Sequence, residues 1–571
     1  MNISTKSWSS FSPKQTQVPI LEYIIATSIF LAGLCLRVWY IFRFHFDTDE
    51  PQHLQVVWSW VRGSIQYRDI FDNHTPLFHL ACTPFMRVIG ENACALYWMR
   101  LVMVLLFIAT MFFSYIIAKN LFSRRVALWT VALTGIYPAF FFCSLQFRAD
   151  ILWMALWLAA MAIFMGKRLT PARLFWSSLL LGAALCTSLK TTALLFALLI
   201  AAVFALGWRT GKQKHIITHD WPRSFLSILA GFLLIPLILI FFFSHHHALS
   251  QLFYCTISHN ILPHIGHWNQ LWRLIVFAFS LPVVFLLSKT LSFTSDLKTV
   301  GIWRAILFAA VVLYFLFLFS FWPIVTRQDF LPLYSLISIM IIPFIVLGAS
   351  NQGQKRQIRC YPSLIMFSLA LIEILVIFLY SPPWRNDTKG LIAQIREVLY
   401  LTASNDWVID QKGETVFRPR PCYFKLESFT RERYSRGLLK DDIVSNLISK
   451  RCYVATNSIS RFPPETRAFL RDNYLKIGNI RVAGKLLYPG KANPLDYSFH
   501  IPIPGQYTLI TPAGPVSGAL DNRPYHGSCL LGSGYHHFRA NRAPEHLAVI
   551  WSRAADKGFS PFTHGQSLKK N

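Results

Sequence analysis

Long apolar runs alternate with short polar loops over the first two thirds of the chain. A helix of about twenty apolar residues crosses the hydrocarbon core of a bilayer. Runs of this length, or nearly so, begin near Val18, Ala95, Val126, Ile151, Leu174, Thr192, Phe225, Leu271, Trp303, Leu333 and Tyr361. The pattern predicts an α-helical polytopic membrane protein with about eleven transmembrane helices over residues 18–384, preceded by a polar cytoplasmic tail at residues 1–17.

The amino-acid composition changes after the last apolar run: the sequence becomes polar and contains many Pro and Gly residues. Over residues 385–490, helical patterns such as GLIAQIREVLYL alternate with strand patterns such as DWVID and CYVAT, which predicts a small α/β domain. Over residues 491–571, the short strand patterns YSFHIPI, QYTLIT and HLAVIWS are separated by turn residues. This second pattern is typical of a β-sandwich.

Positive charge is concentrated in alternate loops between the apolar runs, and such loops face the cytoplasm. The residues that carry it include Lys119, Arg124, Arg125, Arg173, Arg223, Lys289, Lys298 and Arg304. With an odd number of spans, the loop after the first run and everything after Tyr380 lie on the extracytoplasmic side. We find no cleavable signal or sorting motif. These observations favour a bacterial inner membrane over the endoplasmic reticulum.

Composition supports a membrane protein: of 571 residues, 54% are hydrophobic, and the mean hydropathy is +0.41. The net charge of +28 would indicate nucleic acid in a soluble chain. Because the cations lie mostly in loops, we expect membrane lipids rather than nucleic acid as partners. Cys422 and Cys452 lie in the polar C-terminal part. A disulfide between them is one expectation and free thiols are the other.

The loop from Asp47 to Leu80 gathers charged residues between two apolar runs. Its acids are Asp47, Asp49, Glu50, Asp69 and Asp72, and its histidines are His53, His74 and His79. Adjacent residues on a helix point about 100° apart, so Asp49 and Glu50 need not serve one centre. They are either a catalytic pair or two solvated carboxylates at a helix N-terminus, where the helix dipole favours acids.

The loop resembles the first outer loop of the GT-C glycosyltransferases in the protein O-mannosyltransferase superfamily. That superfamily includes dolichyl-phosphate-mannose protein mannosyltransferases and bacterial aminoarabinose transferases. The matching positions are Asp49, Glu50, Gly63, Tyr67, Asp69, Asp72 and His74 to Leu77. The resemblance covers roughly Val18 to Tyr380, with weaker matches at FRAD, LKTT and TRQDFLPLY. Where many members carry a Lys-Pro-Pro type sequence, this chain has His74-Thr75-Pro76, which removes a lysine.

The resemblance implies a glycosyltransferase that moves a sugar, with inversion, from a polyprenyl-phosphate donor to a glycan, lipid or protein acceptor of the cell envelope. Such a reaction needs a base for the acceptor and cations for the departing phosphate. We expect Asp49 to be the base and Glu50 to position it. The predicted phosphate-binding cations are Arg327, Arg148, Lys190 and His74. Asp69 and Asp72 complete the predicted substrate-binding set, and snorkelling at the membrane interface is the alternative role for the cations.

A histidine-rich segment over residues 245–268 suggests a divalent metal ion, held by Asp72 and His264 as in some relatives. The alternative is an amphipathic interfacial helix with Phe253 and Tyr254 at head-group level. The C-terminal part contains no catalytic triad spacing, phosphate loop or zinc motif, so it is expected to be a structural cap or to dock the acceptor. Two other functions compete with the enzyme: a lipid or sugar transporter or flippase, and a catalytically inactive relative.

Overall fold

The computed structural model describes residues 18–165, 169–207, 221–265, 271–292, 298–355, 362–490 and 493–562. The predicted tail, residues 1–17, and the end of the histidine-rich segment, residues 266–268, lie outside these ranges. The chain divides into two compact units. The first unit comprises Met1–Phe44, His74–Ala81 and Tyr97–Asn386, and the second comprises His45–Asn73, Cys82–Leu96 and Asp387–Asn571. Residues 47–73, which contain all five acids of the loop, therefore fold with the C-terminal part of the chain.

Each predicted apolar run forms a helix. These helices are α1 (Ile20–Ile41), α4 (Ala95–Leu121), α5 (Arg124–Ile136), α7 (Ala149–Phe164), α8 (Pro171–Thr187), α9 (Thr191–Gly207), α10 (Trp221–His245), α12 (Leu271–Ser292), α13 (Lys298–Phe321), α14 (Leu331–Lys355) and α15 (Pro362–Tyr380). Among the described residues, seven helices are long and apolar enough to cross a membrane: α1, α4, α10, α12, α13, α14 and α15. The chain is an integral membrane protein, and crossing by the shorter α5, α7, α8 and α9 stays a prediction.

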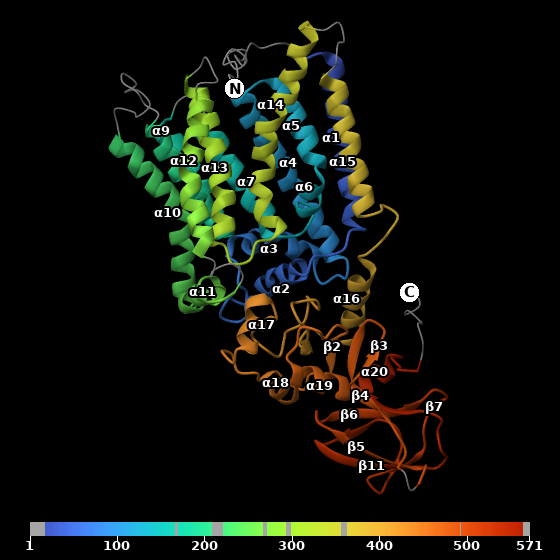
Figure 1. Cartoon of the computed structure of the whole chain (residues 1–571). Helices are drawn as coiled ribbons and strands as arrows, with labels where there is room; N and C mark the ends of the chain where they lie inside the picture. Colours follow the sequence, from blue (N-terminus) through green and yellow to red (C-terminus); the bar gives the residue numbers. More distant parts are fainter. Residues whose placement is uncertain are drawn as a thin grey trace. The chain divides into compact units, whose positions relative to one another are not determined.

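Glycines let two of these helices approach closely. α8 packs against α10, and Figure 1 shows the long helices of this unit running side by side. A Cβ atom at Gly182 would collide with the Phe232 carbonyl, and one at Gly231 would collide with the Phe175 carbonyl. Small residues at such crossings allow backbone-to-backbone packing, which stabilises helix pairs in a lipid environment.

Short elements connect the long helices of the first unit. They are α6 (Pro138–Cys143), α11 (Leu249–Thr256), η3 (Ser258–Asn260) and η4 (Arg327–Phe330). α11 begins four residues after α10 ends and carries Phe253 and Tyr254. α3 (Leu77–Ile89) is a shorter apolar helix.

The second unit combines helices with two sheets. Its helices are α2 (Asp49–Val61), α16 (Lys389–Leu401), α17 (Ser428–Ser435), α18 (Ile443–Ser449), α19 (Pro464–Asn473) and α20 (Ser552–Asp556). Its strands are β1 (Val408–Ile409), β2 (Val454–Thr456), β3 (Tyr474–Ile477), β4 (Ile480–Leu487), β5 (Asp496–Ile501), β6 (Gly505–Thr511), β7 (Gly514–Pro515), β8 (Gly518–Leu520), β9 (Arg523–Tyr525), β10 (Cys529–Leu531), β11 (Gly534–Ala540) and β12 (Leu547–Trp551).

The larger sheet has the order β1-β2-β4-β12-β6-β10, with β3 on β4 and β7 on β6. β1 and β2 are parallel, whereas the other pairs in this sheet are antiparallel. The smaller sheet has the order β5-β11-β8-β9. β12 pairs with both β4 and β6, so the larger sheet takes strands from residues 385–490 and from residues 491–571.

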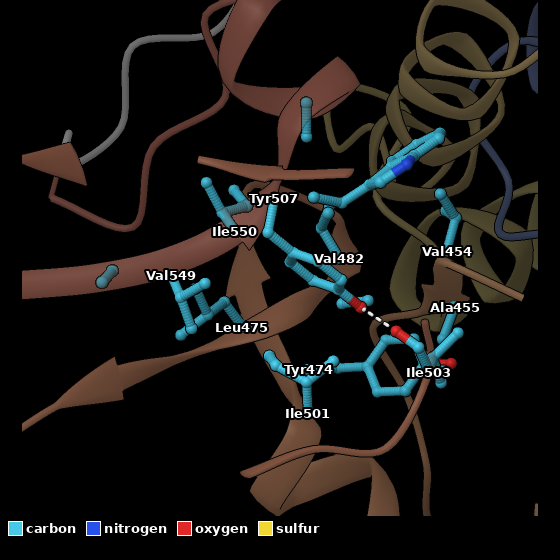
Figure 2. Close-up of a cluster of buried hydrophobic side chains, with 14 of the residues drawn as sticks. Val454, Ala455, Tyr474, Leu475, Val482, Ile501, Ile503, Tyr507, Val549 and Ile550 are labelled. Carbon is cyan, nitrogen blue, oxygen red and sulfur yellow. Dashed lines mark hydrogen bonds between the residues drawn. The ribbon is translucent and has the colours of Figure 1, made fainter. Parts of the chain in front are cut away.

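A hydrophobic core fills the space between these strands and the helices around them. Figure 2 shows part of it, where the buried Tyr507 hydroxyl donates a 2.8 Å hydrogen bond to the Ile503 carbonyl. Cys422 and Cys452 are both buried in this core, and both are free thiols. The disulfide expected as one alternative is therefore not formed, and the two cysteines act as small apolar core residues.

Candidate functional site

Asp49 and Glu50 are the first two residues of α2, as their position in the sequence predicts. The Glu50 side chain is fully buried, and its Oε1 accepts a hydrogen bond of 2.9 Å from the Asp47 backbone N–H. The Asp49 backbone N–H in turn donates to Asp47 Oδ1 at 2.9 Å. Glu50 therefore fixes the turn that leads into the helix, while the Asp49 carboxylate is left for other contacts.

The Asp49 carboxylate forms an ion pair with the Lys412 ammonium. Lys412 Nζ also lies 3.4 Å from the Thr48 hydroxyl. The Asp49 and Lys412 side chains are 15% and 11% exposed, so the pair is largely shielded but not completely buried. Sequence reasoning missed Lys412, because a lone lysine in a polar turn gives no signal of a distant partner.

A tight turn positions Lys412 against α2. The Asp410 carboxylate accepts hydrogen bonds from the backbone N–H groups of Gly413 and Thr415, each at 3.0 Å. Gly413 adopts a φ of +99°, a conformation that strongly favours glycine. A Cβ atom there would lie 3.0 Å from Gln52 Cα. The turn can therefore approach the helix backbone only because this position is a glycine.

Asp72 is buried beside the same helix. Its Oδ1 accepts a hydrogen bond from Gln52 Nε2 at 2.7 Å, and its Oδ2 accepts one from Gln66 Nε2 at 3.2 Å. The Lys425 ammonium donates to the Gln52 carbonyl at 3.3 Å. Burial lowers the pKa of Lys425 from 10.5 to about 8, and the Asp72 charge partly opposes this shift. Lys425 is thus a second cation that the sequence did not reveal.

Asp69 has a local structural role. Its carboxylate forms a 2.8 Å ion pair with Arg68 and accepts a 2.8 Å hydrogen bond from the Ile65 backbone N–H. The hydrogen bond from Arg68 holds the pKa of Asp69 below its usual value. These contacts close the loop between α2 and Asp72.

In the first unit, two predicted phosphate-binding cations meet in one buried cluster. Lys190 Nζ lies 2.9 Å from Asp150 Oδ1 and also forms an ion pair with Asp329. Arg148 Nε lies 3.1 Å from Asp150 Oδ2. Two cations and two carboxylates balance each other here, as buried charges require. The FRAD motif contributes two of these four residues, and the LKTT and TRQD motifs contribute one each, although their sequence spacing did not predict the contact.

Arg327 is exposed and lies at the start of η4. The Thr326 and Asp329 side chains cap this short helix, so the sequence TRQD fixes where Arg327 is placed. The Arg327 guanidinium donates to the Tyr380 hydroxyl at 3.0 Å. No carboxylate among the described residues lies within ion-pair distance of it. His74 is half-buried in the same unit.

The predicted metal ligands fall in different units: Asp72 belongs to the second and His264 to the first. Their joint site remains a prediction. Within the second unit, a ring nitrogen of the buried His53 lies within 4.8 Å of an Asp72 carboxylate oxygen. Imidazole and carboxylate are donors that suit divalent transition metals. His53 and Asp72 therefore offer two ligands for such an ion.

The chain is similar to known proteins in part of its sequence and in its fold. Residues 73–241 match the family described as dolichyl-phosphate-mannose-protein mannosyltransferase. The fold is similar to that of ArnT from Cupriavidus metallidurans in the apo state, with a TM-score of 0.53 and 12% identity over 80% of this chain and 97% of that one. The same protein bound to undecaprenyl phosphate gives a TM-score of 0.52 and 11% identity, over 81% and 97% of the two chains.

The apo oligosaccharyltransferase of Archaeoglobus fulgidus is also similar, with a TM-score of 0.44 and 10% identity over 89% of this chain and 76% of that one. No curated protein sequence matches the chain. The helical region followed by a mixed β-sheet region is thus an ArnT-like fold.

Proposed function

We propose that this chain is a GT-C glycosyltransferase of the protein mannosyltransferase superfamily and uses a lipid-phosphate-linked sugar. The family match over residues 73–241 and the ArnT-like fold support this proposal. The protein transfers a sugar from a polyprenyl-phosphate donor to a glycan, lipid or protein acceptor on the extracytoplasmic face of a bacterial inner membrane. An acceptor oxygen or nitrogen attacks the anomeric carbon while the bond to the phosphate oxygen breaks. The acceptor proton passes to the Asp49 carboxylate, and the polyprenyl phosphate leaves as an anion. Attack opposite the leaving group inverts the anomeric centre.

The ion pair between Asp49 and Lys412 is the observation that carries this proposal. A general base must carry a lone pair that the acceptor can reach. Asp49 is largely shielded from water, and one oxygen of its carboxylate pairs with a flexible ammonium. A lysine ammonium is a single point charge on a rotatable stem. We infer that Lys412 orients the Asp49 carboxylate and that their ion pair opens when the acceptor binds. Lys412 is therefore a positioning residue.

Arg327 is our first choice for binding the donor phosphate. Guanidinium groups grip phosphate oxygens bidentately, and this one has no competing carboxylate among the described residues. Arg148 and Lys190 already balance Asp150 and Asp329. We propose that these paired cations do not bind the phosphate directly, but form a rigid cluster whose electrostatic potential acts on it. His74 is the remaining candidate.

A reconstitution experiment tests the proposed reaction against transport. Purified protein in vesicles receives a polyprenyl-phosphate sugar with a radiolabelled sugar, together with an envelope extract as the acceptor source. We expect the label to leave the lipid, and free polyprenyl phosphate to appear in equal amount. A flippase would leave the label on the lipid while moving it to the other leaflet, and that result would overturn the proposal.

A further inference from the structure

A partly open cavity of about 370 Å³ lies within the second unit, among side chains that the reaction above does not use. This volume falls within the range of small-molecule binding sites. Among its lining residues are Trp407, Lys450, Arg451, Tyr453, Trp551 and Arg553. They come from the turn before β1, from the segment between α18 and β2, from the end of β12 and from α20.

Aromatic rings form one wall of the cavity. Tyr453 and Trp551 stack with their ring centroids 4.9 Å apart and their planes only 9° apart. The Tyr453 ring fills the space that a side chain at Gly505 would need, so a larger residue there would displace it. The Tyr453 hydroxyl is anchored to the Pro504 carbonyl at 2.7 Å. The wall is therefore rigid and aromatic, and aromatic rings attract the positively polarised C–H groups of a ligand.

Positive charge dominates the rim. Lys450 Nζ lies 4.5 Å from the centre of the Trp407 ring and donates to a backbone carbonyl at 2.7 Å. Arg553 pairs with Asp406 at 2.5 Å and lies over Trp551 at 4.9 Å. The Arg451 guanidinium has neither an ion pair nor a hydrogen bond to any described residue. Three cations thus face a single carboxylate.

Arg451 occupies a backbone position that favours glycine. It follows α18 with a φ of +49°, in the left-handed region where helices commonly end on glycine. Its N–H donates to the Ile448 carbonyl at 3.1 Å, which closes the end of the helix. A bulky cation in a strained conformation suggests that the side chain has a use other than folding.

We propose that this cavity binds an acidic sugar. The aromatic wall takes the C–H face of a pyranose ring, and the unpaired Arg451 guanidinium takes a carboxylate or phosphate group on that sugar. A neutral sugar would not pair with the cations of the rim, and an anion without a sugar ring would not pack against the aromatic wall. The site therefore discriminates by requiring both features in one ligand. The proposal does not depend on Asp49 or on the transfer reaction.

Calorimetric titration of the full-length protein in detergent tests this proposal. The probes are trigalacturonate, its neutral methyl ester, citrate as a bare anion, and AMP as an anion with an aromatic base. We expect trigalacturonate to bind at least about tenfold more tightly than each of the others. Equal affinity for the ester, or preference for AMP, would overturn the proposal.

Arg451→Gly is the diagnostic variant, because glycine suits the backbone conformation and removes only the guanidinium. It should fold as well as wild type and bind trigalacturonate about tenfold more weakly, as expected for loss of one charge-assisted contact. The matched control is Arg523→Gln, which alters an exposed arginine of β9 on the smaller sheet. Unchanged binding by Arg451→Gly, or equal loss in the control, would contradict the assignment.

The acidic sugar can belong to a free glycan or to a glycolipid head group. Phosphatidylcholine vesicles with and without glucuronosyl diacylglycerol distinguish the two sources. Competition with trigalacturonate by the glucuronosyl vesicles shows that head groups reach the site, whereas no competition assigns it to free glycans. Asp49→Asn should bind trigalacturonate as tightly as wild type does. The binding proposal and the proposed reaction can therefore be disproved independently of each other.

Discussion

Asp49 and Lys412 form an ion pair although 363 positions separate them in the chain. The contact joins the first turn of α2 to a turn just after β1. Both residues belong to the same compact unit, which combines the acidic loop with the C-terminal region. The proposed base therefore receives its partner from the region after the last apolar helix.

Lys412→Gln tests the positioning role of this lysine. Loss of the ammonium disfavours the ionised carboxylate of Asp49, so the acid limb of the pH–rate profile should move to higher pH. We expect transfer at neutral pH to fall by about tenfold, which corresponds to about 1.4 kcal/mol of transition-state stabilisation. Lys412→Arg should restore part of the rate. Lys440→Gln, at an exposed lysine of the same unit, is the control, and an unshifted profile in Lys412→Gln would contradict the role.

Lys425 should make stability depend on pH. Its pKa is lowered by burial to about 8, against 10.5 for an unburied lysine. Below pH 8 both folded and unfolded states carry the proton, and the folded state bears the cost of a buried charge. Between pH 8 and 10.5 the unfolded state binds more protons, so the free energy of unfolding rises with pH by roughly 3 kcal/mol. Lys425→Met should remove this rise when thermal unfolding is followed from pH 7 to 11, and an identical rise in both proteins would contradict the assignment.

Gly413→Ala should destabilise the turn that carries Lys412. The new Cβ would lie 3.0 Å from Gln52 Cα, and alanine resists the φ of +99°. We expect a loss of about 1–3 kcal/mol, seen as a lower unfolding temperature, together with slower transfer. Gly390→Ala is the matched control, because its Cβ would meet nothing within 4 Å and α16 favours alanine. Equal effects of the two substitutions would refute this account of the turn.

The orientation of the chain is a prediction that a reporter can test. The basic loops place the region after Tyr380 on the extracytoplasmic side. Alkaline phosphatase fused after Tyr380 should be active in intact bacteria, because the enzyme needs an oxidising compartment. A fusion within the basic loop after α4, near Arg124, should be inactive. The reverse pattern would place Asp49 on the wrong face for the proposed donor.

The sequence predicted the positions of the apolar helices well because a long apolar run is a local property, and seven of them are long and apolar enough to cross a membrane. Each of the eleven predicted runs is a helix, from α1 to α15. The strands at Val408 and Val454 were also predicted from local patterns. α17 and β3 were not, since the polar SFTRERYS pattern gives little helical signal, and Tyr474 begins a strand directly after α19.

Contacts between distant residues could not be predicted in this way. The motifs containing Arg148, Lys190 and Asp329 were singled out one by one, but only the fold shows that Asp150 lies between the two cations. Lys412 and Lys425 carried no motif at all. Buried charged side chains must pair, but the sequence does not show which of them are buried together. Their partners can therefore be identified only in the folded structure.

The most direct test of the central claim compares Asp49→Asn with wild type in the radiolabelled transfer assay. Loss of a general base should slow transfer by about a hundredfold or more, while Asp472→Asn, at an exposed acid at the end of α19, should retain full activity. Folding is checked by equal thermal unfolding of the variants. Transfer by Asp49→Asn at a rate near that of wild type would show that this carboxylate does not accept the proton.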